Sequence, residues 1–244
     1  MKFFNPIIWL GEVTSPLKLT LLRISIIFFI ERSEIVEDRV VRLNVKNIIF
    51  YFLGFFIVGL GAVMFYRANF GAGPWDTVTY NLSALIKATR GQTSMIISTT
   101  LMLIVIMYNK NLRFLFMLVP ILSVGFAIDF WDILVFGDNF NIIARILLFI
   151  GGMVSLPFGL ALVIHTGFPA FVFDELTIMI MKITKKGLKP VRLSIELTGV
   201  LLGTIIGFIA GIKFGAVGIG SFVVAAFIGS FIHYYLNLLK RLKV

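Results

Sequence analysis

The sequence contains two long segments that match each other, and in each a glycine- and proline-containing loop interrupts an apolar stretch. GFFIVGLGAVMFYRANFGAGPWDTVT begins at Gly54, and GMVSLPFGLALVIHTGFPAFVFDELT begins at Gly152. An offset of 98 residues aligns them without a gap and pairs Asp76 with Asp174. Because chance identities between apolar helices are common, the glycine and polar matches carry the weight. They predict an internal duplication, and interrupted apolar segments at matching places in two halves are typical of membrane transporter binding sites.

Composition restricts the chain to the membrane. Mean hydropathy is +1.02, 59% of residues are hydrophobic and 14% are charged, whereas about 25% of residues are charged in soluble domains. The net charge of +10 is assigned to cytoplasmic loops that meet anionic lipid, and not to nucleic acid, because the basic residues are not interleaved with base-stacking aromatic residues. The chain has no cysteine, which excludes disulfides and thiolate metal sites.

The chain divides into an N-terminal extension and a duplicated domain. Residues 1–47 lie outside the repeat, and residues 16–30 form an apolar segment with Lys18 and Arg23. This segment is short for a span, so we interpret it as an interfacial helix, with an additional span as the alternative. Residues 48–244 form the transmembrane domain, with repeat 1 at 48–136 and repeat 2 at 142–239.

Each repeat is predicted to hold helices in the order long, short, long, long. The expected helices of the first copy are 48–66, 74–89, 92–108 and 114–135, and those of the second are 142–165, 172–184, 191–210 and 217–239. The prediction is an all-α polytopic membrane protein with about six full spans and two short or broken helices.

The short helices either cross the membrane or re-enter it. If they cross, there are eight crossings and the halves are parallel repeats; if they re-enter, each half crosses three times and the repeats are inverted. The distribution of Lys and Arg favours eight crossings slightly, with the C-terminus in the cytoplasm.

Carboxylates within apolar stretches are the leading candidates for function, because an ionised carboxylate at mid-bilayer costs about 2.5–3.5 kcal/mol and needs a partner or a cavity. Together with the loop residues at the two breaks, they give a candidate substrate or ion path. Its members are Gly71, Gly73, Pro74, Trp75, Asp76, Asp129, Pro169, Asp174 and Glu196.

The loop GAGPWD has a mechanical and a functional interpretation. Gly71 and Gly73 permit unusual backbone angles, and Pro74 suits the first turn of a helix. Asp76 either caps this helix or, together with Asp174, faces a small polar solute at the break; the two roles are compatible.

The other acidic candidates also have structural alternatives. Asp129 and Asp132 share one helix face, and their repeat counterparts are Phe227 and Ser230, so they are either residues at the membrane interface or charges special to one half. Glu196 stands four residues after Arg192. That spacing predicts an ion pair, with proton or cation coupling as the functional alternative.

No enzyme is expected. The two histidines are isolated, and metal-binding, nucleophile-elbow, phosphate-loop and dinucleotide-binding motifs are missing from the sequence. We therefore predict no catalytic residue, no metal and no cofactor.

Several segments resemble the YczE/YyaS/YitT group of bacterial integral membrane proteins, and its YczE-like branch in particular. They are RANFGAGPWDTVTYNLS, GQTSMIIS, LSVGFAIDFWDIL and GIGSFVVAAFIGSFI. The resemblance covers about Leu43 to Leu239, and GxGPWD is its most specific piece. It implies a multi-pass protein of the bacterial cytoplasmic membrane with duplicated helices, and it implies no activity or site residue.

The leading hypothesis is a small-solute transporter whose site lies between the repeats, where the two breaks approach each other. The alternative is a membrane scaffold or accessory protein that acts through a membrane-protein partner or as a homo-oligomer. The sequence does not reveal the solute, the coupling ion or the oligomeric state.

Overall fold

In the computed structural model the described residues are 45–134, 140–168 and 171–241. The chain divides into two units, 1–40 and 41–244, and the described residues all belong to the second. The proposed interfacial helix at 16–30 and the candidate Pro169 lie outside the described residues.

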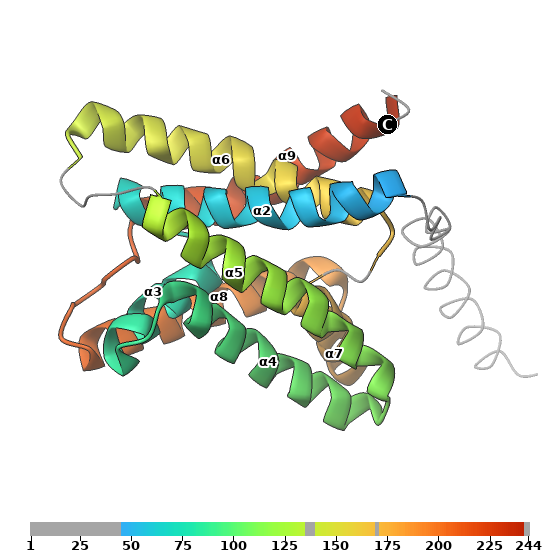
Figure 1. Ribbon diagram of the computed structural model, residues 1–244. Helices are drawn as coiled ribbons and strands as arrows, with labels where there is room; N and C mark the ends of the chain where they lie inside the picture. Colours follow the sequence, from blue (N-terminus) through green and yellow to red (C-terminus); the bar gives the residue numbers. More distant parts are fainter. Residues whose placement is uncertain (1–44, 135–139, 169–170, 242–244) are drawn as a thin grey trace, which may run out of the picture. The chain divides into compact units, whose positions relative to one another are not determined.

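The described residues form helices joined by short loops and turns, and the helices follow the predicted order long, short, long, long twice in succession (Figure 1). The elements are α2 (Val45–Ala68), α3 (Pro74–Ile86), α4 (Arg90–Asn109), the 3-10 helix η2 (Leu112–Met117), α5 (Leu118–Leu134), α6 (Ile142–His165), α7 (Val172–Thr184), α8 (Leu188–Ile209) and α9 (Ile219–Arg241).

Six segments are long and apolar enough to cross a bilayer: Val45–Ala68, Arg90–Asn109, Leu112–Leu134, Ile142–His165, Pro190–Ile209 and Ile219–Arg241. The two remaining helices, α3 and α7, have 13 residues each. At 1.5 Å per residue such a helix is about 20 Å long, too short for a hydrocarbon core of about 30 Å. The predicted fold class, an all-α polytopic membrane protein with six spans and two short helices, is confirmed.

The short helix α3 does not cross the bundle. Arg67 at the end of α2 and Arg90 at the start of α4 both pair with Asp132, so the chain returns to the end from which it left. In Figure 1, α3 lies near one end of the long helices and α7 near the other. This return, together with the six candidate spans, favours a re-entrant course for α3 over the eight crossings that the distribution of Lys and Arg favoured slightly.

The helices α2 and α6 cross at glycines that pair reciprocally. A Cβ added to Gly54 would lie 2.9 Å from the carbonyl oxygen of Gly159, and one added to Gly152 would lie 3.2 Å from that of Gly61. The offset of 98 residues converts the first pair into the second. An inverted duplication would produce such a crossing, although the duplication itself stays a prediction.

Glycines of α8 form the surface on which α3 lies. A Cβ added to Gly199 would lie 3.1 Å from the carbonyl carbon of Pro74, and one added to Gly203 would overlap Thr77. These small residues therefore permit close backbone approach between α8 and α3. Since Gly199 is near the middle of α8, α3 begins about half-way along the bundle.

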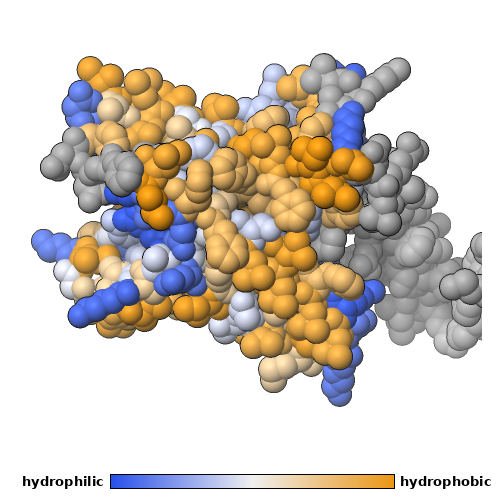
Figure 2. Space-filling model, in the orientation of Figure 1, coloured by the Kyte–Doolittle hydropathy of each residue, from blue (hydrophilic) through white to orange (hydrophobic). Residues whose placement is uncertain are grey.

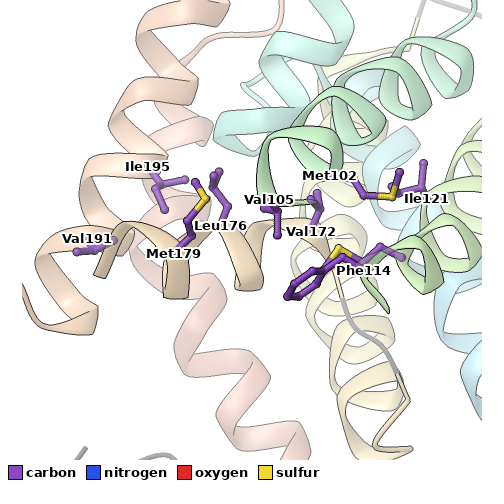
Figure 3. Packing of buried hydrophobic residues seen from close by; sticks show 10 residues of the cluster. Met102, Val105, Phe114, Ile121, Val172, Leu176, Met179, Val191 and Ile195 are labelled. Carbon is purple, nitrogen blue, oxygen red and sulfur yellow. The ribbon is translucent and has the colours of Figure 1, made fainter. Parts of the chain in front are cut away.

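The outer surface is apolar along the helices, and hydrophilic residues gather toward the helix ends (Figure 2). Phe126, Leu147 and Leu201 each expose 60% or more of their surface. A continuous apolar exterior of this kind requires contact with lipid. Inside, an apolar cluster joins α4, η2, α5, α7 and α8, with Met102, Phe114, Val172 and Ile195 among its members (Figure 3).

Candidate functional site

The loop before α3 is held by the backbone of the second half. The carbonyl of Phe70 accepts from the Gly220 N–H at 2.8 Å, and the Ala72 N–H donates to the carbonyl of Ala216 at 2.9 Å. Gly71 has φ +123°, and a Cβ there would lie 2.6 Å from the Ser221 nitrogen. Both its angle and its surroundings therefore require glycine.

Asp76 lies in the first turn of α3. Gly73 is the N-cap, and Pro74 follows at the first helical position, where proline fits because that amide has no partner within the helix. The Asp76 carboxylate folds back toward Gly73, because a Cβ added to Gly73 would lie 2.5 Å from Oδ2. The N-cap residue Gly73 has no side chain with which to bind the free amides at the start of α3. The Asp76 carboxylate lies close to these amides instead, although Asp76 is not the N-cap.

The starts of α3 and α7 meet. The rings of Trp75 and Phe173 pack with centroids 4.9 Å apart, although their helices lie toward opposite ends of the bundle. The first turns of α3 and α7 therefore contact each other, whereas residues 169–170 of the second break lie outside the described residues. Each start carries unpaired amides and the positive end of a helix dipole.

Charged residues of α3, α7 and α8 surround this meeting point. Nε of Arg192 lies 2.9 Å from Oε1 of Glu196, which confirms the predicted pair, and NH1 of Arg192 lies 3.4 Å from Oδ1 of Asp174. Glu196 is also within electrostatic range of Asp76. The structure thus brings two of the predicted carboxylates, Asp174 and Glu196, to one guanidinium and places Asp76 near Glu196.

A cavity of about 770 Å³ opens at the other end of α3. Its lining includes Tyr80, Ser83, Thr89, Arg90, Asp129 and Asp132. Asp129 therefore belongs to this cavity and not to the meeting point of α3 and α7. Asp76, Asp174 and Glu196 are not among the lining residues.

Asp129 and Asp132 fasten the start of α4 to α5. Asp129 accepts from the Gly91 N–H and the Thr89 hydroxyl, each at 2.7 Å. Asp132 accepts from Arg67 at 2.9 Å and also pairs with Arg90. These contacts exceed those of ordinary residues at the membrane interface, because each of the two carboxylates has two partners within the protein.

Tyr66 connects the cavity with the inner carboxylates. The guanidinium of Arg90 lies 5.5 Å from the Tyr66 ring centroid and 4.7 Å from that of Tyr80. Tyr66 is 5% exposed, and its buried hydroxyl makes no hydrogen bond to another described residue within normal limits, while Asp76 lies close enough to interact with it. We use the name polar path for the series Arg90, Tyr66, Asp76, Glu196, Arg192 and Asp174.

Sequence reasoning missed Arg67, Arg90 and Tyr66, because it assigned the arginines to loops. A signal was present. The positions 98 residues after Arg67 and Arg90 are His165 and Leu188, just as Asp132 corresponds to Ser230. Both arginines and the Asp132 carboxylate therefore occur in the first half without a charged counterpart of the same kind in the second, which indicates that they pair with each other.

Comparisons with known proteins identify the family. The model described as "Family of unknown function (DUF6198)" matches residues 45–237, and the chain belongs to this family. It is 24% identical over 194 residues to the uncharacterized protein YyaS of Bacillus subtilis, covering 79% of this chain and 93% of that protein. It is 26% identical over 188 residues to an uncharacterized protein of Haemophilus influenzae, covering 76% and 81%. No solved structure matches.

Proposed function

We propose that this member of a family of unknown function is a carrier for a small polar solute, with its binding site where α3 and α7 begin. The observation that carries the proposal is the meeting of Trp75 and Phe173, at centroids 4.9 Å apart. Two helices that start within the membrane and come from opposite halves are typical of inverted-repeat transporters.

The chemistry at this point also supports a carrier. Unpaired amides at helix starts bind polar or anionic groups, and carboxylates bind cationic groups or hydrogen-bond donors. Asp174 and Arg192 have side-chain exposures of 48% and 42%, so a solute could reach them. Ion pairs within a bilayer are costly, and they are typical of substrate or ion pathways.

Charge distribution supports a cytoplasmic location for the end that carries α7 and the C-terminus. Lys46, Lys110, Arg113, Lys182, Lys185, Lys186, Lys240 and Arg241 lie toward that end. At the opposite end Arg145 donates to the carbonyls of Ala68 and Asn69 at 2.8 Å, and Arg67 and Arg90 bind Asp132. Basic side chains held inside the protein contribute less to the bias toward the cytoplasm. We place the protein in the bacterial cytoplasmic membrane on this basis.

The experiment combines ligand binding with uptake. Purified protein in detergent is screened by thermal shift against amino acids, amines, carboxylic acids and sugars, because ligand binding raises the apparent stability. The solute that stabilises the protein is then offered in radiolabelled form to proteoliposomes. We expect saturable uptake that falls at least tenfold in Asp76→Asn and Asp174→Asn.

Glu175→Gln is the matched control, since Glu175 follows Asp174 in the first turn of α7 and stands outside the polar path. Uptake that is equal in all three variants would place the solute elsewhere. If no solute in the screen binds and none is taken up, the scaffold hypothesis replaces the carrier.

A further inference from the structure

Tyr66 packs beside the side chains that line the cavity. The rings of Tyr66 and Tyr80 have centroids 5.5 Å apart, and Tyr80 and Arg90 line the cavity. Tyr66 itself is 5% exposed, and its hydroxyl is one of three buried side-chain atoms among the described residues that lack a hydrogen-bond partner of normal geometry. Asp76 lies close enough to interact with this hydroxyl.

Charges around Asp76 come from several elements. Helix α2 contributes Tyr66 and Asp132 binds Arg90 nearby, while α8 contributes Glu196 with Arg192. Helix α9 also contacts α3, and residues 219–231 in its first half carry no titratable side chain.

The carboxylates differ in how well they are neutralised. Asp132 has two arginines, and Asp129 accepts from an amide and a hydroxyl. Glu196 and Asp174 share Arg192. Asp76 makes no ion pair with a described residue. A Cβ added to Gly199, about one turn after Glu196 in α8, would lie 3.1 Å from the carbonyl carbon of Pro74 in the first turn of α3, and the Tyr66 ring packs on Tyr80, about one turn after Asp76. Glu196 and Tyr66 are therefore near neighbours of Asp76. Two carboxylates removed from water repel each other, and a proton held between them removes that repulsion.

We infer that Asp76 and Glu196 share the proton that the carrier exchanges across the membrane, with the Tyr66 hydroxyl as its route to the cavity. This inference rests on the proposed function. A proton fits better than a hydrated cation because Asp76 and Glu196 are not among the residues that line the cavity of about 770 Å³. In addition, the described residues contain no group of three or more acidic or histidine side chains suited to a metal.

The protonated carboxyl can be observed directly. Infrared difference spectra of the purified protein, recorded between mildly acidic and mildly alkaline buffer, report the carbonyl stretch of protonated carboxylic acids. We expect a titrating band that is lost in Asp76→Asn, moves in midpoint in Glu196→Gln and is unchanged in Glu175→Gln. Size-exclusion chromatography identifies variants that fail to fold, and either of the first two variants suffices for the test. A band that is missing from the parent, or equal in all variants, overturns the inference.

A second measurement tests whether the proton controls access. Because the chain has no cysteine, Ala84→Cys introduces a single thiol in the cavity lining, and Lys87→Cys introduces one at the nearby exposed end of α3. The ratio of their modification rates by a water-soluble thiol reagent is compared between the parent and Asp76→Asn, because the two thiols titrate alike in both proteins and only the effect of Asp76 differs. We expect this ratio to change severalfold with pH in the parent and to stay constant in Asp76→Asn. A ratio that is constant in the parent overturns the inference.

The two proposals fail separately. Loss of the infrared band with solute uptake intact rejects the proton site and leaves the carrier. A titrating band in a protein that transports nothing rejects the carrier and leaves a protonated carboxylate pair of unassigned use.

Discussion

Gly61→Ala tests the close crossing of α2 and α6. A Cβ at Gly61 would lie 2.6 Å from Cβ, 2.7 Å from N and 2.8 Å from Cα of Leu156. Carbon atoms in contact are normally about 3.5–4.0 Å apart, so the helices would have to separate by about 1 Å. Since backbone atoms block the new methyl group, no change of side-chain rotamer relieves the overlap.

The expected cost follows from two opposing effects. Overpacking a close contact costs about 1–3 kcal/mol, and alanine is better than glycine in a helix by about 1 kcal/mol. We therefore expect the free energy of unfolding to fall by about 1–2 kcal/mol. The matched control is Gly229→Ala in α9, where no atom lies within 4 Å of the added Cβ. It should be neutral or stabilising by up to about 1 kcal/mol.

Thermal unfolding in detergent, followed by the fluorescence of the three tryptophans, measures the difference. The melting temperature of Gly61→Ala should be lower than those of the parent and of Gly229→Ala. Equal melting temperatures for the two glycine variants would refute the crossing of α2 and α6 at Leu156.

Two further outcomes are expected. The buried Asn81 donates to the carbonyls of Gly203 and Phe214 at 2.7 and 3.1 Å and accepts from the Ala216 N–H at 3.0 Å. In chemical denaturation, Asn81→Ala should therefore lower the free energy of unfolding by about 3 kcal/mol. Asn81→Asp keeps the shape of the side chain but loses both donors, so an equally stable Asn81→Asp would contradict this role. In single-cysteine labelling of intact cells, Asn69→Cys and Lys87→Cys should react from one side of the membrane and Lys186→Cys from the other. If Asn69→Cys and Lys87→Cys react from opposite sides, the re-entrant course of α3 is rejected.

The sequence allowed prediction of the helices, since apolar length and Gly/Pro breaks act locally. The start of α3 at Pro74 and both ends of α6 and α7 agree with the structure. The end of α3 was placed three residues late, at Thr89, because Lys87 closes the helix in the left-handed conformation and Thr89 caps α4. A lysine in that conformation has no clear sequence signal.

Topology was beyond the sequence because it depends on contacts between distant residues. Counting basic residues favoured eight crossings, since Lys87, Arg90 and Arg145 were treated as free loop charges. The structure binds Arg90 to Asp132 and Arg145 to the backbone of Ala68 and Asn69. Basic residues that are bound within the protein say more about how its helices pack than about which side of the membrane is cytoplasmic.

The candidate site was predicted in part. The local signals, a carboxylate beside a Gly/Pro break and an i, i+4 pair, identified Asp76 and Glu196. Their proximity depends on α3 lying against α8, which no local pattern encodes. Asp129 was placed in the same path because it is acidic within an apolar segment, whereas its oxygens are held by Thr89 and Gly91.

The attachment of Arg67 and Arg90 to one carboxylate has a consequence for motion. Asp132 ties the residues on either side of the first re-entrant segment to α5, and Asn81 ties α3 to the second half. Both ends of the first short helix are therefore attached to other helices by buried or half-buried polar contacts. If substrate exchange requires helices to move, α3 is expected to move together with α5 and α8 and not independently of them.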